Sequence, residues 1–280
     1  MKTLAVIIGA LQFVAVSARA NGGENFPFHV GEKLTYQIFW GPFVVGRAST
    51  EVAGIEPVNG HDCYHLIASG KTTGFADLLF PVDDRSDSWL DVEQLFTRRY
   101  RQKRSEGGKH WDDDTIFDYD NKVAITTNLL KSVEKRVPID GAVQDTVSTV
   151  YFVRSRPLKL REEQSMIVNA NNQNIKVTVV PDERKSVWIR PLGDVLALRL
   201  EPKPTLKLVA ANKGRMWIWI SDDVRRLPLL TIAETQIGNA RIVLHKIESA
   251  NPSLDQVIRK DDTVASTPAP SATTLEAARH

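Results

Sequence analysis

The sequence is short of cysteine, net charge and long apolar runs, and each shortage excludes a class of protein. Cys63 is the only cysteine among 280 residues, so no disulfide can form within the chain and stability must come from an apolar core. Lys and Arg number 36 and Asp and Glu 34, which gives no general electrostatic reason to bind nucleic acid or an anionic membrane. Any charged surface patch must therefore be local.

Motifs of several enzyme classes are also missing. The chain has no GxSxG nucleophile elbow, HExxH zinc motif, GxGxxG loop or DxDxDG calcium loop. Residues 69–72 (SGKT) resemble the end of a phosphate-binding loop, but His65 stands where that loop requires a glycine. Distant residues can still assemble a catalytic triad, so these absences lower the expectation of an enzyme without removing it. We assign no catalytic residue, cofactor or metal ion from the sequence.

The longest apolar segment lies at the N-terminus and has the parts of a secretory signal. Lys2 is the positive start, residues 4–16 are the apolar run, and residues 18–20 (ARA) form a small-x-small cleavage site. The run is shorter than the about 20 apolar residues of a spanning helix. We therefore predict a signal peptide over residues 1–20, cleavage after Ala20, a periplasmic location and no transmembrane segment in the mature chain.

The mature chain is expected to form one β-rich domain, residues 21–250. Residues 251–280 are rich in Pro, Ser, Thr and Ala and are predicted to be a disordered tail. Between the two ends, apolar and polar residues alternate with a period of two, which predicts strands. Two strands within 96–119 are joined at residues 106–108 (EGG), and the others are expected at 34–40, 44–52, 63–69, 87–90, 122–129, 164–168, 175–181, 185–190, 195–201, 215–221, 228–235 and 240–247.

Two segments have helical spacing instead. Phe75, Leu78 and Leu79 predict one short helix that ends near Pro81. A longer helix is expected around Gln144 to Arg154, with Asp145 in its first turn and Pro157 beyond its end. The side chains that share its apolar face are Val143, Val147, Val150, Tyr151 and Arg154.

The stretch RMWIWISDDVRRLPLL, residues 215–230, is interpreted as a β-hairpin. Trp217 and Trp219 point to one face of the first strand, and the alternating residues Met216, Ile218 and Ile220 point to the other. Both faces are apolar and must be covered, which favours a strongly curled sheet. We predict a mainly β fold, with an antiparallel sheet curled into a barrel or half-barrel and one or two short helices, the longer packed across the open side.

Several polar groups allow a chemical or a structural interpretation. Asp222 and Asp223 suit the hairpin turn, and with His65 they are also the candidates for a hydrolytic site. His61, Cys63 and His65 alternate as metal ligands on a strand would, although a single cysteine is commonly a small core residue. Arg101 should lie opposite Asp112 or Asp114, where cross-strand ion pairs explain the charges without an anion or partner patch.

Three ordered segments together resemble the bacterial exported proteins grouped as the domain-of-unknown-function 3108 family. They are GEKLTYQIFWGPFVVGRASTEV, DTVSTVYFVRSRPL and GRMWIWISDDVRRLPLLTIAETQIGNARIVL, and the resemblance covers residues 26 to 248. It implies a periplasmic or envelope-associated β-rich protein with no established activity, and it supplies no catalytic motif. The chain departs from the family at residues 160–163 (LREE), where a glycine-containing turn is expected.

Large aromatic side chains suggest what the curled sheet encloses. Tyr36, Trp40, Trp188, Trp217 and Trp219 are the expected lining of an apolar cavity, although the same residues could fill a solid core. We expect a non-catalytic envelope protein that binds a lipid-like or apolar ligand. The alternatives are an envelope interaction or assembly module with a filled core, whose partner is an envelope protein, and an envelope hydrolase.

Overall fold

The computed structural model describes residues 26–190, 192–204, 215–235 and 238–249. The predicted signal peptide, residues 1–20, and the predicted tail, residues 251–280, lie outside the described residues. Neither helix in the described part of the chain has the length and apolar character needed to span a bilayer.

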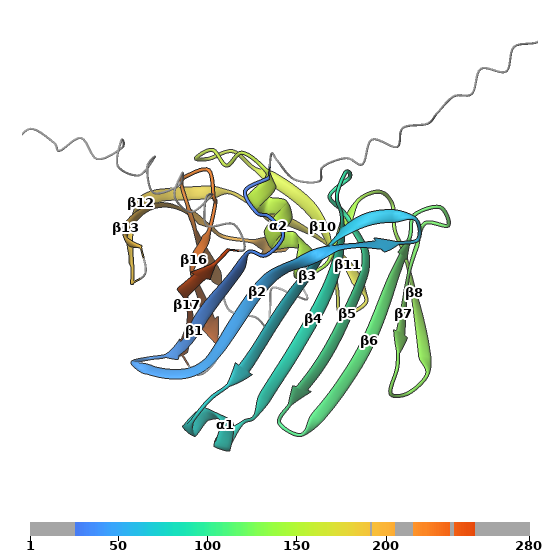
Figure 1. Ribbon diagram of the computed structural model, residues 1–280, viewed down its shortest axis with the longest axis horizontal. Helices are drawn as coiled ribbons and strands as arrows, with labels where there is room; N and C mark the ends of the chain where they lie inside the picture. Colours follow the sequence, from blue (N-terminus) through green and yellow to red (C-terminus); the bar gives the residue numbers. More distant parts are fainter. Residues whose placement is uncertain (1–25, 191, 205–214, 236–237, 250–280) are drawn as a thin grey trace, which may run out of the picture.

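One curled antiparallel sheet of 13 strands forms most of the fold (Figure 1). Strand β17 pairs with β1, so the two ends of the described chain meet inside the same sheet. In spatial order the strands are β12 (Pro181–Ile189), β13 (Gly193–Leu200), β15 (Met216–Ser221), β16 (Pro228–Thr235), β17 (Gly238–Glu248), β1 (Lys33–Trp40), β2 (Phe43–Val58), β3 (His61–Thr72), β4 (Val82–Asp91), β5 (Thr97–Glu106), β6 (Lys109–Asp118), β7 (Val123–Asn128) and β8 (Val133–Pro138).

Strands β12 and β8 are the two edges of this sheet, and the described strands do not join them to each other. The sheet is therefore an open half-barrel, which confirms the predicted fold class. Both edge strands are highly charged: Asp182, Glu183, Arg184 and Lys185 lie on β12, and Glu134, Lys135 and Arg136 lie on β8.

A second, four-stranded sheet and two helices complete the described fold. The small sheet has the order β14 (Lys203–Pro204), β11 (Gln173–Val179), β10 (Gln164–Ala170) and β9 (Val143–Gln144). Helix α1 (Phe75–Leu79) lies in the β3–β4 connection, as predicted from its spacing. Helix α2 (Ser148–Ser155) lies between two parts of the large sheet, the β12–β17 strands on one side and the β3–β8 strands on the other, and close to the small sheet (Figure 1).

Of the three apolar clusters in the described part of the chain, two include residues of α2. Val147 and Tyr151 pack with strands β2 to β7 in the first cluster, while Val153 packs with the small sheet and Ile220 of β15 in the third. The second cluster lies on strands β12 to β17 and β1, and it contains Trp219. Trp219 and Ile220 therefore pack in different clusters, which confirms that both faces of β15 are covered.

The longer helix begins later than the sequence pattern predicts. It starts at Ser148, and Val143 and Gln144 instead form β9, which pairs in parallel with β10. The Asp145 carboxylate accepts the backbone N–H groups of Val147, at 2.6 Å, and Ser148, at 2.9 Å. These hydrogen bonds satisfy amides that a helix leaves open at its start, so the helix begins after Asp145.

The turns of the large sheet fall at two opposite ends. The β2–β3, β4–β5 and β6–β7 turns lie at the end beside α2, which we call the helix-covered end. The β1–β2 and β5–β6 turns, the β3–β4 connection with α1, and the β7–β8 turn lie along the lower edge of Figure 1, which we call the apolar rim.

The loop before β10 shows why a glycine is expected there. Arg161 has a φ of 67°, in the left-handed region where glycine is favoured. Its backbone N–H donates to the Pro181 carbonyl at 2.7 Å, which fixes the turn against the start of β12. The chain thus keeps a turn conformation that suits glycine while placing an arginine in it.

Candidate functional site

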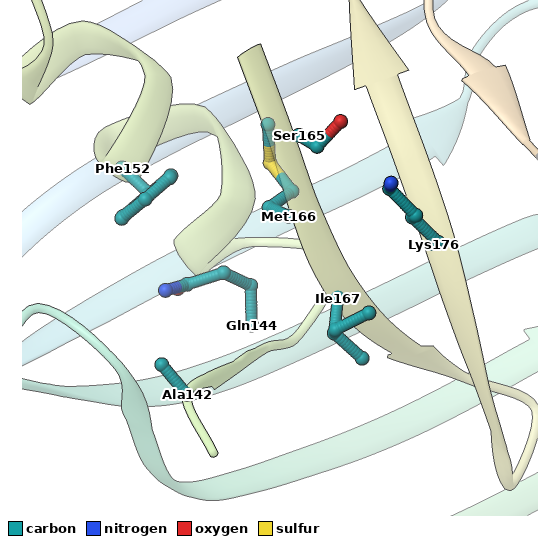
Figure 2. Close-up of a pocket in the computed structure, with 7 residues that line it drawn as sticks. All are labelled: Ala142, Gln144, Phe152, Ser165, Met166, Ile167 and Lys176. Carbon is teal, nitrogen blue, oxygen red and sulfur yellow. The ribbon is translucent and has the colours of Figure 1, made fainter. Parts of the chain in front are cut away.

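A pocket of about 310 Å³ lies between α2 and the small sheet (Figure 2). Strand β9 pairs with β10 only at Ile167 and Val168, so the edge of β10 beyond them is not covered by β9. Phe152 of α2 faces this part of β10 across the pocket. The lining residues are Ala142, Gln144, Phe152, Ser165, Met166, Ile167 and Lys176.

Gln144 is the polar group deepest in this lining. Its side chain is 2% exposed, and its Nε2 donates to the Leu95 carbonyl at 2.6 Å. Its other amide atom, Oε1, is buried and has no hydrogen-bond partner among the described residues. A buried acceptor without a partner costs about 1 to 3 kcal/mol, and Oε1 has almost no accessible surface on the pocket side.

A buried hydrogen-bond network fixes the chain between Gln144 and the start of α2. Ser88 and Thr97 donate their hydroxyls to Oδ2 of Asp145, at 2.5 and 2.8 Å, while Oδ1 receives the helix amides. Burial raises the pKa of Asp145, and the hydrogen bonds from Ser88, Ser148 and Thr97 oppose that rise. The network is a helix cap tied to β4 and β5, and it holds Gln144 and Phe152 in position.

Two cations lie beside the apolar part of the lining. Lys176 is the direct neighbour of Ile167 across the β10–β11 ladder, and its side chain is exposed. The guanidinium of Arg156 lies 4.8 Å from the centroid of the Phe152 ring. Among the described residues neither Lys176 nor Arg156 forms an ion pair. The pocket thus joins an apolar surface, one buried acceptor and positive charge at its mouth.

The aromatic residues predicted to line a cavity lie elsewhere. Tyr36 and Trp219 are 7% and 6% exposed and belong to the second apolar cluster, against which Trp217 packs. The Trp40 ring lies beside Gly238, where an added Cβ would be 3.6 Å from its Nε1, and Trp188 is 64% exposed. The structure brings Tyr36, Trp217 and Trp219 to one cluster and leaves Trp40 and Trp188 outside it. Their assignment as ligand-binding residues stays a prediction.

The candidate hydrolytic residues occupy separate places. Asp223 accepts the Ser221 hydroxyl at 2.7 Å and the backbone N–H groups of Arg225 and Arg226, so it caps the β15–β16 turn. Asp222 pairs with Arg184 of β12. His65 is several strands away on β3. The predicted structural interpretation of these aspartates matches their contacts.

His65 lies in an ion-pair array on the outer face of the sheet. It hydrogen-bonds Glu56 at 3.0 Å and Asp87 at 2.8 Å, and its ring stacks on Trp89. The Trp89 indole N–H is the main cause of a lowered pKa of Glu56. Burial alone would raise the pKa of Asp87, but hydrogen bonds from Arg85 and His65 lower it.

The alternating His61, Cys63 and His65 do not form a metal cluster. The described residues contain no group of three or more His, Cys, Asp and Glu side chains that could hold an ion. Cys63 is fully buried, and burial raises the pKa of its thiol to about 12. His61 instead lies 3.2 Å from the guanidinium of Arg98.

The outer-face arginines pair as the sequence predicts. Arg101 lies opposite Asp114 in the β5–β6 ladder, and its guanidinium bonds Asp112 at 3.1 Å. Asp114 is bonded by Arg99. Arg101 and its neighbours therefore pair as cross-strand charges do.

Sequence reasoning missed one buried charge beside the site. Arg154 is fully buried in α2 and forms two hydrogen bonds with Glu32, at 2.6 and 2.9 Å. It also donates to the carbonyls of Pro27 and Arg225, which ties α2 to the segment before β1 and to the β15–β16 turn. The signal was an arginine on the apolar face of the predicted helix, because a charge there requires a buried partner.

The pocket residues themselves gave almost no sequence signal. Gln144 lay inside a segment with helical spacing, and Met166 and Ile167 lay inside an ordinary alternating strand. Ala142 and Lys176 are unremarkable surface positions in the sequence. Only the packing of α2 against the small sheet brings them together.

Comparisons with known proteins agree with this architecture. The β-barrel-like protein of domain of unknown function DUF1849 from Brucella abortus matches with a TM-score of 0.52 and 8% identity, over 79% of this chain and 98% of that one. At that identity the match shows a shared fold alone. None of the curated proteins matches this chain.

Two other crystal structures match less well. One is a candidate exported protein with a YmcC-like fold from Bacteroides fragilis, with a TM-score of 0.30 and 9% identity over 79% of this chain and 97% of that one. The other is a candidate lipoprotein from Parabacteroides distasonis, with a TM-score of 0.30 and 9% identity over 80% of this chain and 98% of that one.

The family resemblance seen in three ordered segments is confirmed over most of the chain. The family model described as "Protein of unknown function (DUF3108)" matches residues 35–245, from within β1 to within β17. The chain belongs to the DUF3108 family.

Proposed function

We propose that this protein is an exported envelope protein that binds an amphipathic, lipid-like ligand without catalysis. The observation that supports it is the pocket between α2 and the small sheet. Its volume of about 310 Å³ falls at the lower end of the roughly 300 to 1,000 Å³ of small-molecule sites. The N-terminal signal pattern supports export to the periplasm.

The lining suggests the chemistry of the ligand. An apolar segment would contact Phe152, Met166 and Ile167, and its burial is the main source of affinity. An anionic group would be favoured near Lys176 at the mouth. A long-chain carboxylate or phosphate ester meets these requirements.

The contacts of the polar residues favour binding over hydrolysis. A hydrolase needs a nucleophile or activated water near a base in an open cleft. His65 on β3 is several strands away from Asp222 and Asp223, both aspartates are engaged in the contacts of their turn, and Asp145 is sealed inside a helix cap. Among the described residues that line the pocket, none carries a carboxylate or an imidazole.

Binding of a hexadecanoate probe tests the proposal. Ala142 is exposed at the pocket, so Ala142→Trp should fill the site without disturbing the core, and the affinity should fall by about tenfold or more. Ala53→Trp, at an exposed position on β2, is the matched control. Hexadecanol should bind more weakly than hexadecanoate, and Lys176→Glu should remove that difference.

Native mass spectrometry of the chain purified from a bacterial periplasm gives a second readout. A stoichiometric lipid-sized adduct that disappears in Ala142→Trp and persists in Ala53→Trp is the expected result. Equal probe binding by all three proteins would show that this pocket is not the binding site.

A further inference from the structure

Most of the large apolar side chains that the structure leaves exposed gather at the apolar rim. Helix α1 buries none of its residues: Phe75 is 75% exposed, Leu78 82% and Leu79 67%. Phe80 follows the helix, and Phe43, which begins β2 after the β1–β2 turn, is 71% exposed. The other exposed apolar residues of this end are Val44, Leu129, Leu130, Val133 and Met216.

The apolar side chains of α1 are held outward by fixed contacts. Thr72 donates its hydroxyl to Asp77 at 3.0 Å and accepts the backbone N–H of Val82 at 2.8 Å, which closes the loop around the helix. The Phe80 ring lies so close to Gly107 of the β5–β6 turn that a Cβ there would come within 2.5 Å of it. The connection is therefore closed by its own strand ends and packed against the β5–β6 turn.

Cations border these apolar side chains. Arg47 and Lys71 lie directly opposite each other on β2 and β3 just before α1, where like charges repel. Lys109 begins β6 after the β5–β6 turn, Lys131 lies in the β7–β8 turn, and Arg241 donates to the Gly41 carbonyl at 2.9 Å. Among the described residues none of these five cations forms an ion pair.

The acidic residues of the rim offset this charge only in part. Glu106 is paired with Arg104, while Asp77 accepts only a neutral hydroxyl and keeps its charge. Asp77 and Asp83, which lies opposite Lys71 in the β3–β4 ladder, are the exposed acids at α1, against the five unpaired cations. The rim is thus locally basic in a chain whose charges nearly balance.

We propose that the apolar rim docks on a lipid bilayer that contains anionic lipids. Apolar side chains that project beyond a row of turns can enter the headgroup region, and Lys and Arg beside them are attracted to anionic lipids. A protein interface would instead be depleted of lysine around its apolar centre. The interaction module expected as an alternative from sequence would use this same surface.

Vesicle flotation with the exported chain tests the docking. The N-terminus of the purified protein is first identified by mass spectrometry, so that a retained apolar leader is not mistaken for the rim. The wild-type protein should float with vesicles of phosphatidylglycerol and phosphatidylcholine, and at least about tenfold less with phosphatidylcholine alone. High salt should also lower the bound fraction, because it screens the attraction.

Variants separate the rim from the rest of the surface. The double variant Leu78→Glu, Leu79→Glu should lower the partition onto anionic vesicles by about tenfold or more, since burial of a leucine alone contributes that much. Val224→Glu is the apolar-to-acidic control at the opposite end, where Val224 is 69% exposed. Lys71→Glu with Lys109→Glu should lower binding, while Lys122→Glu in the β6–β7 turn should not.

Three results would overturn the docking proposal. The wild-type protein could fail to float with anionic vesicles, or the rim and control variants could lose binding equally. The wild-type protein could also be a dimer that Leu78→Glu, Leu79→Glu converts to a monomer, which would assign the rim to a second copy. The hexadecanoate pocket is tested separately by Ala142→Trp, so failure of one proposal leaves the other intact.

Discussion

The two ends of the large sheet are built on opposite principles. At the helix-covered end, turns are closed by carboxylates: Asp91 accepts the backbone N–H groups of Glu93 and Gln94, and Asp118 accepts that of Asn121. At the apolar rim, α1 buries nothing and leucine and phenylalanine side chains face outward. The same strands run between both ends, so the difference lies in the turns alone. Stability is concentrated at one end, and exposed apolar surface at the other.

The largest expected effect is at the helix-covered end. Arg154→Met would leave the Glu32 carboxylate buried and unpaired, and should lower the free energy of unfolding by about 3 to 5 kcal/mol. Urea unfolding measures this. The double variant with Glu32→Gln should lose less than the single variants added together. Arg199→Met, which breaks an exposed pair with Asp182, should cost under about 1 kcal/mol.

The next largest effect comes from the cap of α2. Asp145→Ala removes the acceptor of two helix amides and of the Ser88 and Thr97 hydroxyls, and should cost about 2 kcal/mol or more. The matched change at the rim, Asp77→Ala, removes one hydrogen bond from an exposed loop and should cost well under half as much. Equal losses in thermal unfolding would contradict the contrast between the ends.

Two aspartates on β4 should respond to acid in opposite directions. Burial alone would raise the pKa of Asp91, but hydrogen bonds from Gln94, Arg98 and Glu93 lower it. Its contribution to stability is therefore present above the unfolded-state pKa of about 4 and is lost as the pH falls through the lower folded value. At the rim, burial raises the pKa of Asp84, so its contribution is largest at low pH and is lost as the pH rises through the folded value.

Denaturant unfolding at pH 7 and pH 3 distinguishes the two aspartates. Asp91→Asn should destabilise the protein by about 1 to 2 kcal/mol at pH 7 and by less at pH 3, below the unfolded-state pKa. Asp84→Asn should be neutral or slightly stabilising at pH 7. The same pH dependence in both variants would show that the two ends do not differ in this respect.

The smallest expected effect on stability is at the rim itself. Leu78→Ser with Leu79→Ser should change the free energy of unfolding by less than about 0.5 kcal/mol, because both side chains are exposed in the folded chain. The same variant should lower self-association at high concentration, which light scattering measures. A loss of several kcal/mol would mean that α1 is covered in the folded protein.

Local patterns predicted most of the fold, because hairpins are specified by neighbouring residues. The alternation around Trp217 and Trp219, the turn at Gly107 and the spacing of α1 all lie within single short segments. The strand β8 was missed because three charged residues, Glu134 to Arg136, fill its centre at a sheet edge, which interrupts the alternation. The start of α2 was placed too early because Val143 continues the helical spacing while its backbone pairs with β10.

The candidate site could not be predicted in the same way. The unpaired acceptor of Gln144 depends on Leu95 taking the amide N–H from another part of the chain. The pocket exists because β9 stops after two residues and leaves part of β10 open. No periodicity records where a strand stops pairing. The aromatic residues chosen from the sequence were selected for their size. Size does not separate the two interpretations, because a solid core needs large side chains as much as a cavity lining does.

The charged edge strands affect how readily the protein aggregates. An exposed strand edge is a template on which another chain can add a strand, and long open sheets are prone to polymerise in this way. The arginines, lysines and carboxylates of β12 and β8 make such addition unfavourable at both edges. The sheet can therefore stay open without offering either edge to strand addition.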